Sequence, residues 1–525
     1  MRAVLITTAI LALSACAATP PADQVILNAT VITMDPDNPR AQALAIRDGV
    51  FVAVGTNEQA KKHIGPDTEV LDYTGKLVTP GLTDSHYHLR GVGEREMTLN
   101  LAGINGLNEF LAKVQDYAEA NPDNEWITGR GWIETHWDPP VFPTRHQLDQ
   151  VVPDRPVFLT RADGHAAIAN TRALEIAGID EHTEAPTGGR IEAGGMLIDT
   201  AQQLVRRHIP NGGRPDAKEA LRIGGEVAQR QGWVGVHNIV DSWEDVEWLR
   251  QLYHEDKMPI TNYVAIRWPS EGAEHLLRIG PQIDIVPGKL TVRAIKINLD
   301  GALGSRGAAL LEPYADDPDN VGLIYHTEDA LRDVLTRARD AGIQVWTHAI
   351  GDRANRMILD LYEEVLTDSN VGAAPSRRDH RWRIEHAQHL TAEDIPRFAE
   401  LGVIASMQPS HAIGDLHFAP ARLGLERLQY AYAWRSLLNA GAIIAGGSDA
   451  PVEVGDPCIE LHAATTRSDL DGHVAPGWHP KQALALRHAI KMFTQNAAHA
   501  SFLKRSRSMI RLGTRANKYA ISTRH

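Results

Sequence analysis

The sequence predicts an α/β fold, a (β/α)8 TIM-type barrel joined to a small β-sandwich module. Apolar, strand-like runs alternate with amphipathic helical patterns over roughly 400 residues, close to the eight repeats of a closed barrel. In addition, reactive side chains lie where several of these runs stop, and barrel enzymes build their sites at the C-terminal ends of strands. A doubly wound open sheet is the alternative, but it would collect its ligands at a single switch point. The distribution of these side chains therefore favours the barrel.

The N-terminal segment, residues 1–23, is typical of an exported protein. Arg2 precedes an apolar stretch at residues 3–13, and residues 13–16, Leu-Ser-Ala-Cys, resemble the lipobox of bacterial lipoproteins. This resemblance implies a lipoprotein signal peptide, a lipid anchor through Cys16 at the outer membrane, and a short tether. The alternative is an ordinary secretory signal that leaves the protein free in the periplasm. Either way the protein is expected in a bacterial cell envelope, and Cys458 has no expected disulfide partner.

Residues 24–75 are expected to form the N-terminal part of the β-sandwich module. Strand-like runs at residues 25–27, 29–33, 43–46 and 51–54 are separated by Asp-Pro, Asp-Gly and Gly-Thr turns. Short strands bounded by such turns are typical of a small β unit, which precedes the helical patterns.

Residues 76–500 are expected to form the barrel. Its predicted apolar runs lie at residues 156–159, 235–240, 292–297, 344–347, 383–385, 403–407 and 443–446. Amphipathic patterns at residues 330–341 and 392–401 predict helices between them. After the N-terminal segment, no apolar stretch is long enough to cross a bilayer.

The composition limits the classes of partner. With 525 residues the chain is long enough to bury a sizeable core. It has 53 Lys and Arg against 66 Asp and Glu, a formal net charge of −13, and no long basic block before the C-terminal tail. A nucleic-acid partner is therefore not supported.

Two histidines, His86 and His88, follow the short apolar run at residues 77–79. Side chains two positions apart on an extended strand share a face, so both imidazoles can bind one metal ion. Because the chain has 24 histidines, such a pair can also arise by chance on a surface. A metal site is favoured because further candidate ligands end later apolar runs, namely Lys296, His348, His386 and Asp449.

Each later candidate has a simpler interpretation when taken alone. His348 could be a core histidine, and Lys296 could be a solvated lysine at a strand end. Asp449 could belong to a turn, because Gly, Ser and Pro surround it. The Gly-Asp-Arg sequence at residues 351–353 and the apolar run at residues 442–445 favour strand ends instead.

Longer motifs resemble those of the amidohydrolase superfamily and, within it, amidohydrolase family 3, the group of N-substituted formamide deformylase. They are PGLTDSHYH at residues 80–88, DGH at 163–165, KINLDGALGSR at 296–306, THAIGDRA at 347–354, RIEHAQ at 383–388, SMQP at 406–409 and GSDAP at 447–451. Together they span nearly the whole predicted barrel.

The resemblance implies a metal shell of His86, His88, Lys296, His348, His386 and Asp449. In this superfamily such a lysine is carbamylated by CO₂, which would make Lys296 an anionic ligand that bridges two metals. Imidazole and oxygen donors suit Zn²⁺, as one or two ions, and Mn²⁺ or Co²⁺ could substitute. Asp449 would accept a proton from the attacking water and return it to the departing amine. The implied reaction is hydrolysis of the C–N bond of a small N-acyl or N-formyl compound.

A second group of residues is expected to contact the substrate. His165 is a catalytic candidate that would face the substrate or its tetrahedral intermediate, with a plain loop histidine as the alternative. Arg306, His411 and Trp132 are candidates for substrate binding. For Trp132, which has Trp137 and Phe142 near it in sequence, an aromatic core cluster is the more frequent outcome.

Residues 501–525 are expected to be a shortened C-terminal part of the β-sandwich module. Residues 510–521 have the outline of the family's closing segment, but Thr514 and Asn517 stand where Lys and Asp are expected. The predicted ligands all lie before residue 494, so a short C-terminus would lower stability rather than remove the chemistry. An unpaired strand edge would also favour association, so a homo-oligomer is one expectation.

Two alternatives to amide hydrolysis stay open at this point. Another hydrolysis within the superfamily, of a cyclic amide, an ester or a phosphoester, would use the same metal shell with different substrate loops. A catalytically inactive envelope lipoprotein that binds a ligand is the alternative from another class. Such a protein would have no need of Asp449.

Overall fold

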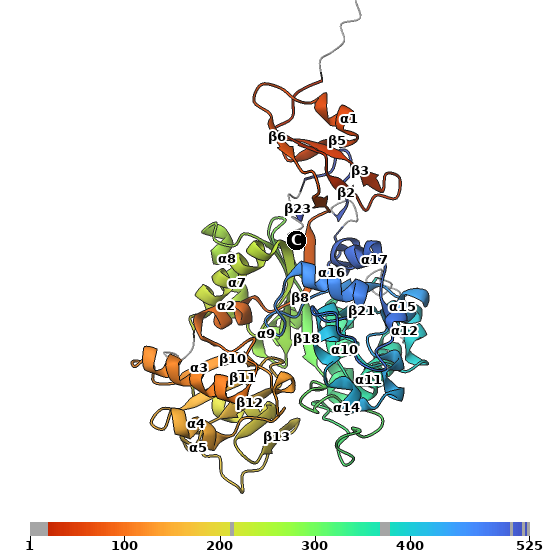
Figure 1. Ribbon diagram of the computed structural model, residues 1–525. Coiled ribbons are helices and arrows are strands. Elements are labelled where there is room, and N and C mark those ends of the chain that lie inside the picture. Colours follow the sequence, from red (N-terminus) through yellow and green to blue (C-terminus); the bar gives the residue numbers. More distant parts are fainter. Residues whose placement is uncertain (1–18, 211–214, 368–378, 504–507, 517–519, 522–525) are drawn as a thin grey trace, which may run out of the picture. The chain divides into compact units, whose positions relative to one another are not determined.

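The computed structural model describes residues 19–210, 215–367, 379–503, 508–516 and 520–521 (Figure 1). The chain divides into two compact units, one of residues 1–80 with 509–525 and one of residues 81–508. The expected signal peptide, including Cys16, and the substituted position Asn517 lie outside the described residues. Among the described helices, none combines the length and apolar character that a membrane span requires.

Eight parallel strands form the central sheet of the larger unit. Their order is β22-β21-β20-β19-β18-β16-β15-β8, and every neighbouring pair along this path is parallel. The predicted (β/α)8 barrel is therefore confirmed. A ninth strand, β17 (Gln282–Val286), pairs with β18 in antiparallel fashion. The eight strands are β8 (Leu82–Tyr87), β15 (Trp233–Val240), β16 (Thr261–Trp268), β18 (Leu290–Asn298), β19 (Gln344–Ala349), β20 (Arg383–His386), β21 (Ile404–Met407) and β22 (Ile444–Gly446).

The first and last barrel strands meet through a few specific contacts rather than a full ladder. The Asp449 N–H donates to the carbonyl of His86 at 2.8 Å. The Asp84 carboxylate accepts a hydrogen bond from the Ser448 N–H at 3.0 Å. Gly447 is required between them, because a Cβ there would lie 2.5 Å from the backbone nitrogen of His86. These contacts close the ring and bring its two ends together.

Helices follow most of the barrel strands, as Figure 1 shows for α8 to α12. In α10 (Glu328–Ala341), Thr327 caps the N-terminus by accepting from the Ala330 N–H, and Gly342 ends the helix in the left-handed conformation. Its buried residues recur at helical spacing and face the barrel. The other helices of this outer layer are α2 (Leu89–Met97), α7 (Ala217–Gln231), α8 (Trp243–His254), α9 (Glu271–Ile279), α11 (Asp352–Thr367), α12 (Asp394–Leu401), α13 (Pro409–Asp415), α14 (Ala419–Leu423), α15 (Trp434–Asn439), α16 (Pro457–Thr466), α17 (Leu486–Lys491) and α18 (Ala497–Ala500).

An apolar layer fills the barrel interior. It contains Ile239, Tyr263, Ala265, Ala294 and Trp346, all of them buried. Trp346 lies two positions before His348 on β19 and shares its face. The layer therefore lies beneath the C-terminal mouth of the barrel, where the predicted ligands end their strands.

An inserted segment between β8 and β15 forms a separate six-stranded sheet of order β13-β14-β12-β11-β10-β9. The apolar run at residues 156–159 belongs to β11 of this sheet, so its assignment to the barrel is wrong. The eighth barrel strand is instead β16, which was not among the predicted apolar runs. The inserted sheet contains β9 (Leu99–Asn100), β10 (Ile127–Trp132), β11 (Val157–Arg161), β12 (Ala166–Ala169), β13 (Gly189–Glu192) and β14 (Met196–Asp199), with α3 (Leu107–Ala120), α4 (Arg145–Val151), α5 (Thr171–Ala177) and α6 (Gln203–Arg206).

Two small four-stranded sheets form the smaller unit, in the orders β5-β4-β1-β6 and β23-β7-β2-β3. Side chains from both sheets share one core, which includes Leu44, Val78 and, from the segment after the barrel, Ile510. The chain thus returns to this unit after the barrel. Its elements are β1 (Gln24–Leu27), β2 (Thr30–Ile32), β3 (Arg40–Ala41), β4 (Ala43–Arg47), β5 (Val50–Gly55), α1 (Asn57–Lys61), β6 (Glu69–Asp72), β7 (Leu77–Val78) and β23 (Ala520–Ile521).

Candidate metal centre

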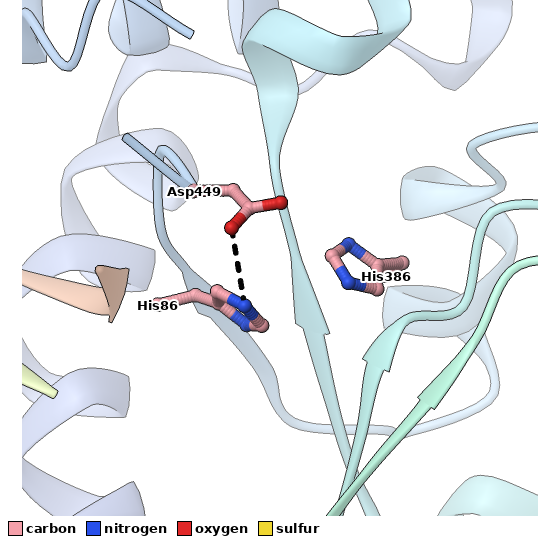
Figure 2. Close-up of side chains that lie close together, drawn as sticks. All are labelled: His86, His386 and Asp449. Atoms are coloured by element: carbon pink, nitrogen blue, oxygen red, sulfur yellow. Dashed lines mark ion pairs between the residues drawn. The ribbon is translucent and has the colours of Figure 1, made fainter. Parts of the chain in front are cut away.

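Three side chains from distant parts of the sequence converge at the barrel mouth (Figure 2). The ligand atoms of His86, His386 and Asp449 all lie within 4.8 Å of one another, and all three residues are buried. Asp449 Oδ1 is 3.3 Å from His86 Nε2. His88, the residue after β8, brings its Nε2 to 2.9 Å from the same carboxylate oxygen. The predicted histidine pair therefore meets Asp449 at one point.

The donor set of this cluster fits a divalent metal ion. Among the described residues, Asp449 Oδ1 finds no hydrogen-bond partner, although it is buried and faces two imidazole nitrogens. A buried carboxylate oxygen is costly in this state unless it is paired or binds a metal. Several imidazoles with one carboxylate are a common ligand set for Zn²⁺.

The backbone is unusual at two of these residues. His386 has a φ of 73° and Asp449 a φ of 60°, values that residues other than glycine rarely adopt. Along β20 the side chains alternate between faces, so a regular residue 386 would point away from the face that carries Glu385. The positive φ breaks this alternation, and the His386 ring lies 4.9 Å from that of His86 between centroids. Such strain is typical of functional sites.

His348 and Lys296 lie beside this cluster on the neighbouring strands β19 and β18. The His348 and His386 rings are 4.5 Å apart between centroids. Lys296 is only 2% exposed, and burial is the main cause that lowers its pKa to about 8. Burial also lowers the pKa of both histidines well below the ordinary value, so their imidazoles are neutral at pH 7. The neutral form is the one that binds a metal.

Glu385 orients His86, a role that the sequence analysis missed. Its Oε2 accepts a hydrogen bond from the Nδ1 of His86 at 2.5 Å. With the proton on Nδ1, the lone pair on Nε2 is free to bind a metal. Burial raises the pKa of Glu385, but Arg383 and His86 more than offset this effect, so the pKa lies well below its ordinary value.

Arg383 holds Glu385 in place. Both side chains are fully buried, and the Arg383 Nε donates to Glu385 Oε1 at 2.7 Å. The guanidinium also donates to the carbonyl of Ser85 at 3.0 Å and lies 3.7 Å over the ring of Trp346. Arg383 and Glu385 carry opposite charges and lie two positions apart in a run that was predicted as a buried strand. That pattern is the sequence signal that could have revealed this pair.

Two residues of the predicted substrate group lie next to the cluster. His411 Nε2 is 3.6 Å from Asp449 Oδ2, and its ring stacks on that of His386 with centroids 5.7 Å apart. The ring of His165 lies 5.2 Å from that of His348 between centroids. Because His165 comes from the inserted sheet, that sheet contributes a side chain to the barrel mouth.

The other two predicted substrate residues lie elsewhere. Arg306 pairs with Asp316, with Nη2 2.9 Å from Oδ2, and no contact between Arg306 and the cluster is found in the described part of the chain. Trp132 is fully buried in the core of the inserted sheet, where its indole N–H donates to the carbonyl of Leu159 at 3.1 Å. The aromatic-core alternative therefore holds for Trp132, because it packs in a buried cluster with Phe110 and Trp137. A substrate-binding role for it is not supported.

Comparison with known proteins settles the family. The family model described as "Amidohydrolase family" matches residues 69–520. The chain belongs to the amidohydrolase family. The resemblance seen in its motifs is thus confirmed. The family assignment makes the protein a metal-dependent hydrolase.

Similar proteins support this assignment, because their similarity extends over almost the entire length of this amidohydrolase. The protein LONG AFTER FAR-RED 3 of Arabidopsis thaliana is 35% identical, over 96% of this chain and 88% of its own. N-substituted formamide deformylase of Arthrobacter pascens is 30% identical, over 94% of this chain and 92% of its own. An uncharacterized metal-dependent hydrolase of Pyrococcus horikoshii OT3 has a similar structure, with a TM-score of 0.73 and 26% identity over 95% of this chain and 97% of its own.

Proposed function

We propose that this amidohydrolase cleaves the C–N bond of an N-acyl or N-formyl compound, with Zn²⁺ as its resident metal. The observation that carries the proposal is the buried Asp449 Oδ1, which makes no hydrogen bond within the described residues and faces the His86 and His88 nitrogens. N-substituted formamide deformylase, a relative over nearly the full length, is named for an N-formyl substrate. That name supports the substrate class.

In this proposal four histidines and Asp449 hold the metal. Lys296 would add a further ligand after carbamylation, in which its neutral amine forms an N–C bond to CO₂ and loses one proton. The product is a carbamate anion, and the burial of Lys296 would protect it from water. The four histidines are His86, His88, His348 and His386.

The remaining chemistry belongs to Asp449 and the residues around it. When bound, the metal would lower the pKa of an attacking water and polarise the carbonyl oxygen. Asp449 accepts the proton that this water loses and transfers it to the amine nitrogen as the C–N bond breaks. The acyl carbon thus gains the hydroxyl group and the amine gains the proton. His165 would hydrogen-bond to the carbonyl oxygen as negative charge develops there.

Metal analysis together with a substrate panel tests this function. The purified protein is expected to contain one or two zinc ions per chain and to hydrolyse members of a panel of N-formyl and N-acyl compounds. Removal of the metal by a chelator should abolish turnover, and added Zn²⁺ should restore it, with Mn²⁺ or Co²⁺ as partial substitutes. Undiminished turnover by the metal-free protein would contradict the proposal. Turnover of esters or phosphoesters alone would assign another hydrolysis to the same centre.

We also propose that Cys16 carries the lipid anchor that holds the protein at the outer membrane. In the native host, Cys16→Ser is expected to move the protein from the membrane fraction to the soluble envelope fraction. Cys458→Ser is the matched control, because Cys458 is an exposed free cysteine in the described structure and should leave the distribution unchanged. A Cys16→Ser variant that stays in the membrane fraction would argue against the anchor.

A further inference from the structure

A carboxylate of the inserted sheet, Asp199, is paired with His165 through both side chain and backbone. Strands β12 and β14 pair with Ala166 opposite Ile198, which places His165 opposite Asp199 one position further along. Asp199 Oδ1 lies 2.6 Å from His165 Nδ1, and the Asp199 N–H donates to the carbonyl of His165 at 2.7 Å. The side chain of Asp199 is 1% exposed and that of His165 17% exposed.

The backbone of Asp199 departs from what its local sequence favours. It precedes a short 3₁₀ turn at Thr200–Gln202, a position where an aspartate ordinarily caps the turn with its side chain. No such cap is present, and Asp199 instead has φ 52° and ψ −121°, a conformation that is costly for any residue except glycine. The Asp199 carboxylate therefore faces His165 instead of capping the turn that follows it.

The Lys296–Arg306 motif and the next residue, Gly307, provide the space for this carboxylate. A Cβ at Gly301 or at Gly307 would lie 2.6 Å from Asp199 Oδ2. Both glycines are thus needed where the loop after β18 passes the inserted sheet. The loop that follows Lys296 is therefore shaped around the partner of His165 as well as around its own strand.

We infer that Asp199 is a positioning residue that keeps the proton of His165 on Nδ1 and presents Nε2 to the substrate. The Nδ1 of His165 is hydrogen-bonded to Asp199. Its Nε2 has no hydrogen bond to any of the described residues. The partly exposed ring lies against His348 at the metal centre. The inference rests on the proposed function for the role of Nε2, but the proton position on His165 can be measured without any substrate.

The proton position is tested in the metal-loaded protein with ¹⁵N-labelled histidine rings. His165→Gln identifies the His165 signals by their loss. The expected result is a protonated Nδ1 and an unprotonated Nε2 in the wild type, and a loss of this preference in Asp199→Gly. A wild-type Nδ1 without a proton, or a preference unchanged by Asp199→Gly, would overturn the inference. This test holds even if no compound of the panel is hydrolysed, which would refute the proposed function alone.

Kinetics with a hydrolysed compound gives the second test. Asp199→Gly is expected to lower kcat by about 10²-fold with a metal content equal to that of the wild type. Asp199→Asn should lose at least as much activity, because its amide NH₂ can donate to Nδ1 and so favour the tautomer that is protonated on Nε2. Because glycine relieves the strained φ, Asp199→Gly should unfold at no lower temperature than Asp199→Asn. A purely structural role predicts that the nearly isosteric Asp199→Asn keeps the kcat of the wild type, and that result would overturn the inference.

A double variant completes the design. His165→Gln/Asp199→Gly should be no slower than His165→Gln, because Asp199 acts through His165. A double variant much slower than His165→Gln would contradict this. The matched control is Asp149→Asn in the same inserted segment, whose carboxylate binds Thr171 and should leave kcat unchanged.

Discussion

Replacing Asp449 by asparagine is expected to lower kcat by about 10²–10⁴-fold, the range for loss of a general acid and base. The amide is close in shape to the carboxylate but cannot take up the proton of the attacking water. It also removes a negative charge that faces the His86 and His88 nitrogens at 3.3 and 2.9 Å, so zinc should bind more weakly. The measurements are kcat on a hydrolysed N-formyl or N-acyl compound at saturating Zn²⁺, and the zinc content after dialysis.

The control for this variant is Asp245→Asn. Asp245 is also buried, but it lies in the first turn of α8, where its carboxylate accepts from the N–H of the N-cap residue Ser242, a bond that an asparagine oxygen can also accept. Its kcat should match that of the wild type. If Asp449→Asn turned over its substrate as fast as the wild type with the same zinc content, the assignment of Asp449 as proton carrier would be refuted.

Arg383→Met is expected to give the largest loss of stability, about 3–5 kcal/mol, because it leaves the buried Glu385 without its cationic partner. Methionine keeps much of the apolar stem but removes the guanidinium that lies over Trp346, so the charge and its cation–π contact are lost together. The measurement is the temperature of thermal unfolding of the metal-free protein. Arg332→Met is the surface control. Arg332 is 37% exposed and pairs with exposed carboxylates, so its removal should change little.

The double variant Arg383→Met/Glu385→Gln separates stability from metal binding. Removing both charges should recover most of the lost stability, because no unpaired charge stays buried. Metal affinity should still fall by about 10- to 100-fold, because His86 loses the carboxylate that orients it. A double variant that is as unstable as Arg383→Met would indicate that the guanidinium contributes mainly by packing.

The strand ends that carry His348, His386 and Asp449 could be predicted because apolar runs precede them, and buried parallel strands have that composition. The inserted sheet could not be distinguished in the same way. Its run at residues 156–159 is as apolar as the run at residues 263–266 of the true barrel strand β16, which Asn262 and Arg267 flank. A periodicity argument has no means of separating these two cases.

The parts of the site that escaped prediction depend on contacts between strands. Glu385 binds a histidine 299 residues away in sequence, and its role follows only from the closure of the barrel. Asp199 meets His165 because of the register between β12 and β14, which no local signal specifies. Trp132 packs in the apolar core of the inserted sheet, and its sequence pattern alone does not distinguish a core position from a pocket position.

The closing contact between Asp84 and Ser448 joins residues 364 positions apart. A nascent or truncated chain that ends before this point holds His86 and His386 but lacks Asp449. Contacts of such long range are slow to form, because chain entropy must be lost before they are made. High-affinity metal uptake should therefore come late in folding, so that a bound metal would mark a barrel whose first and last strands have met.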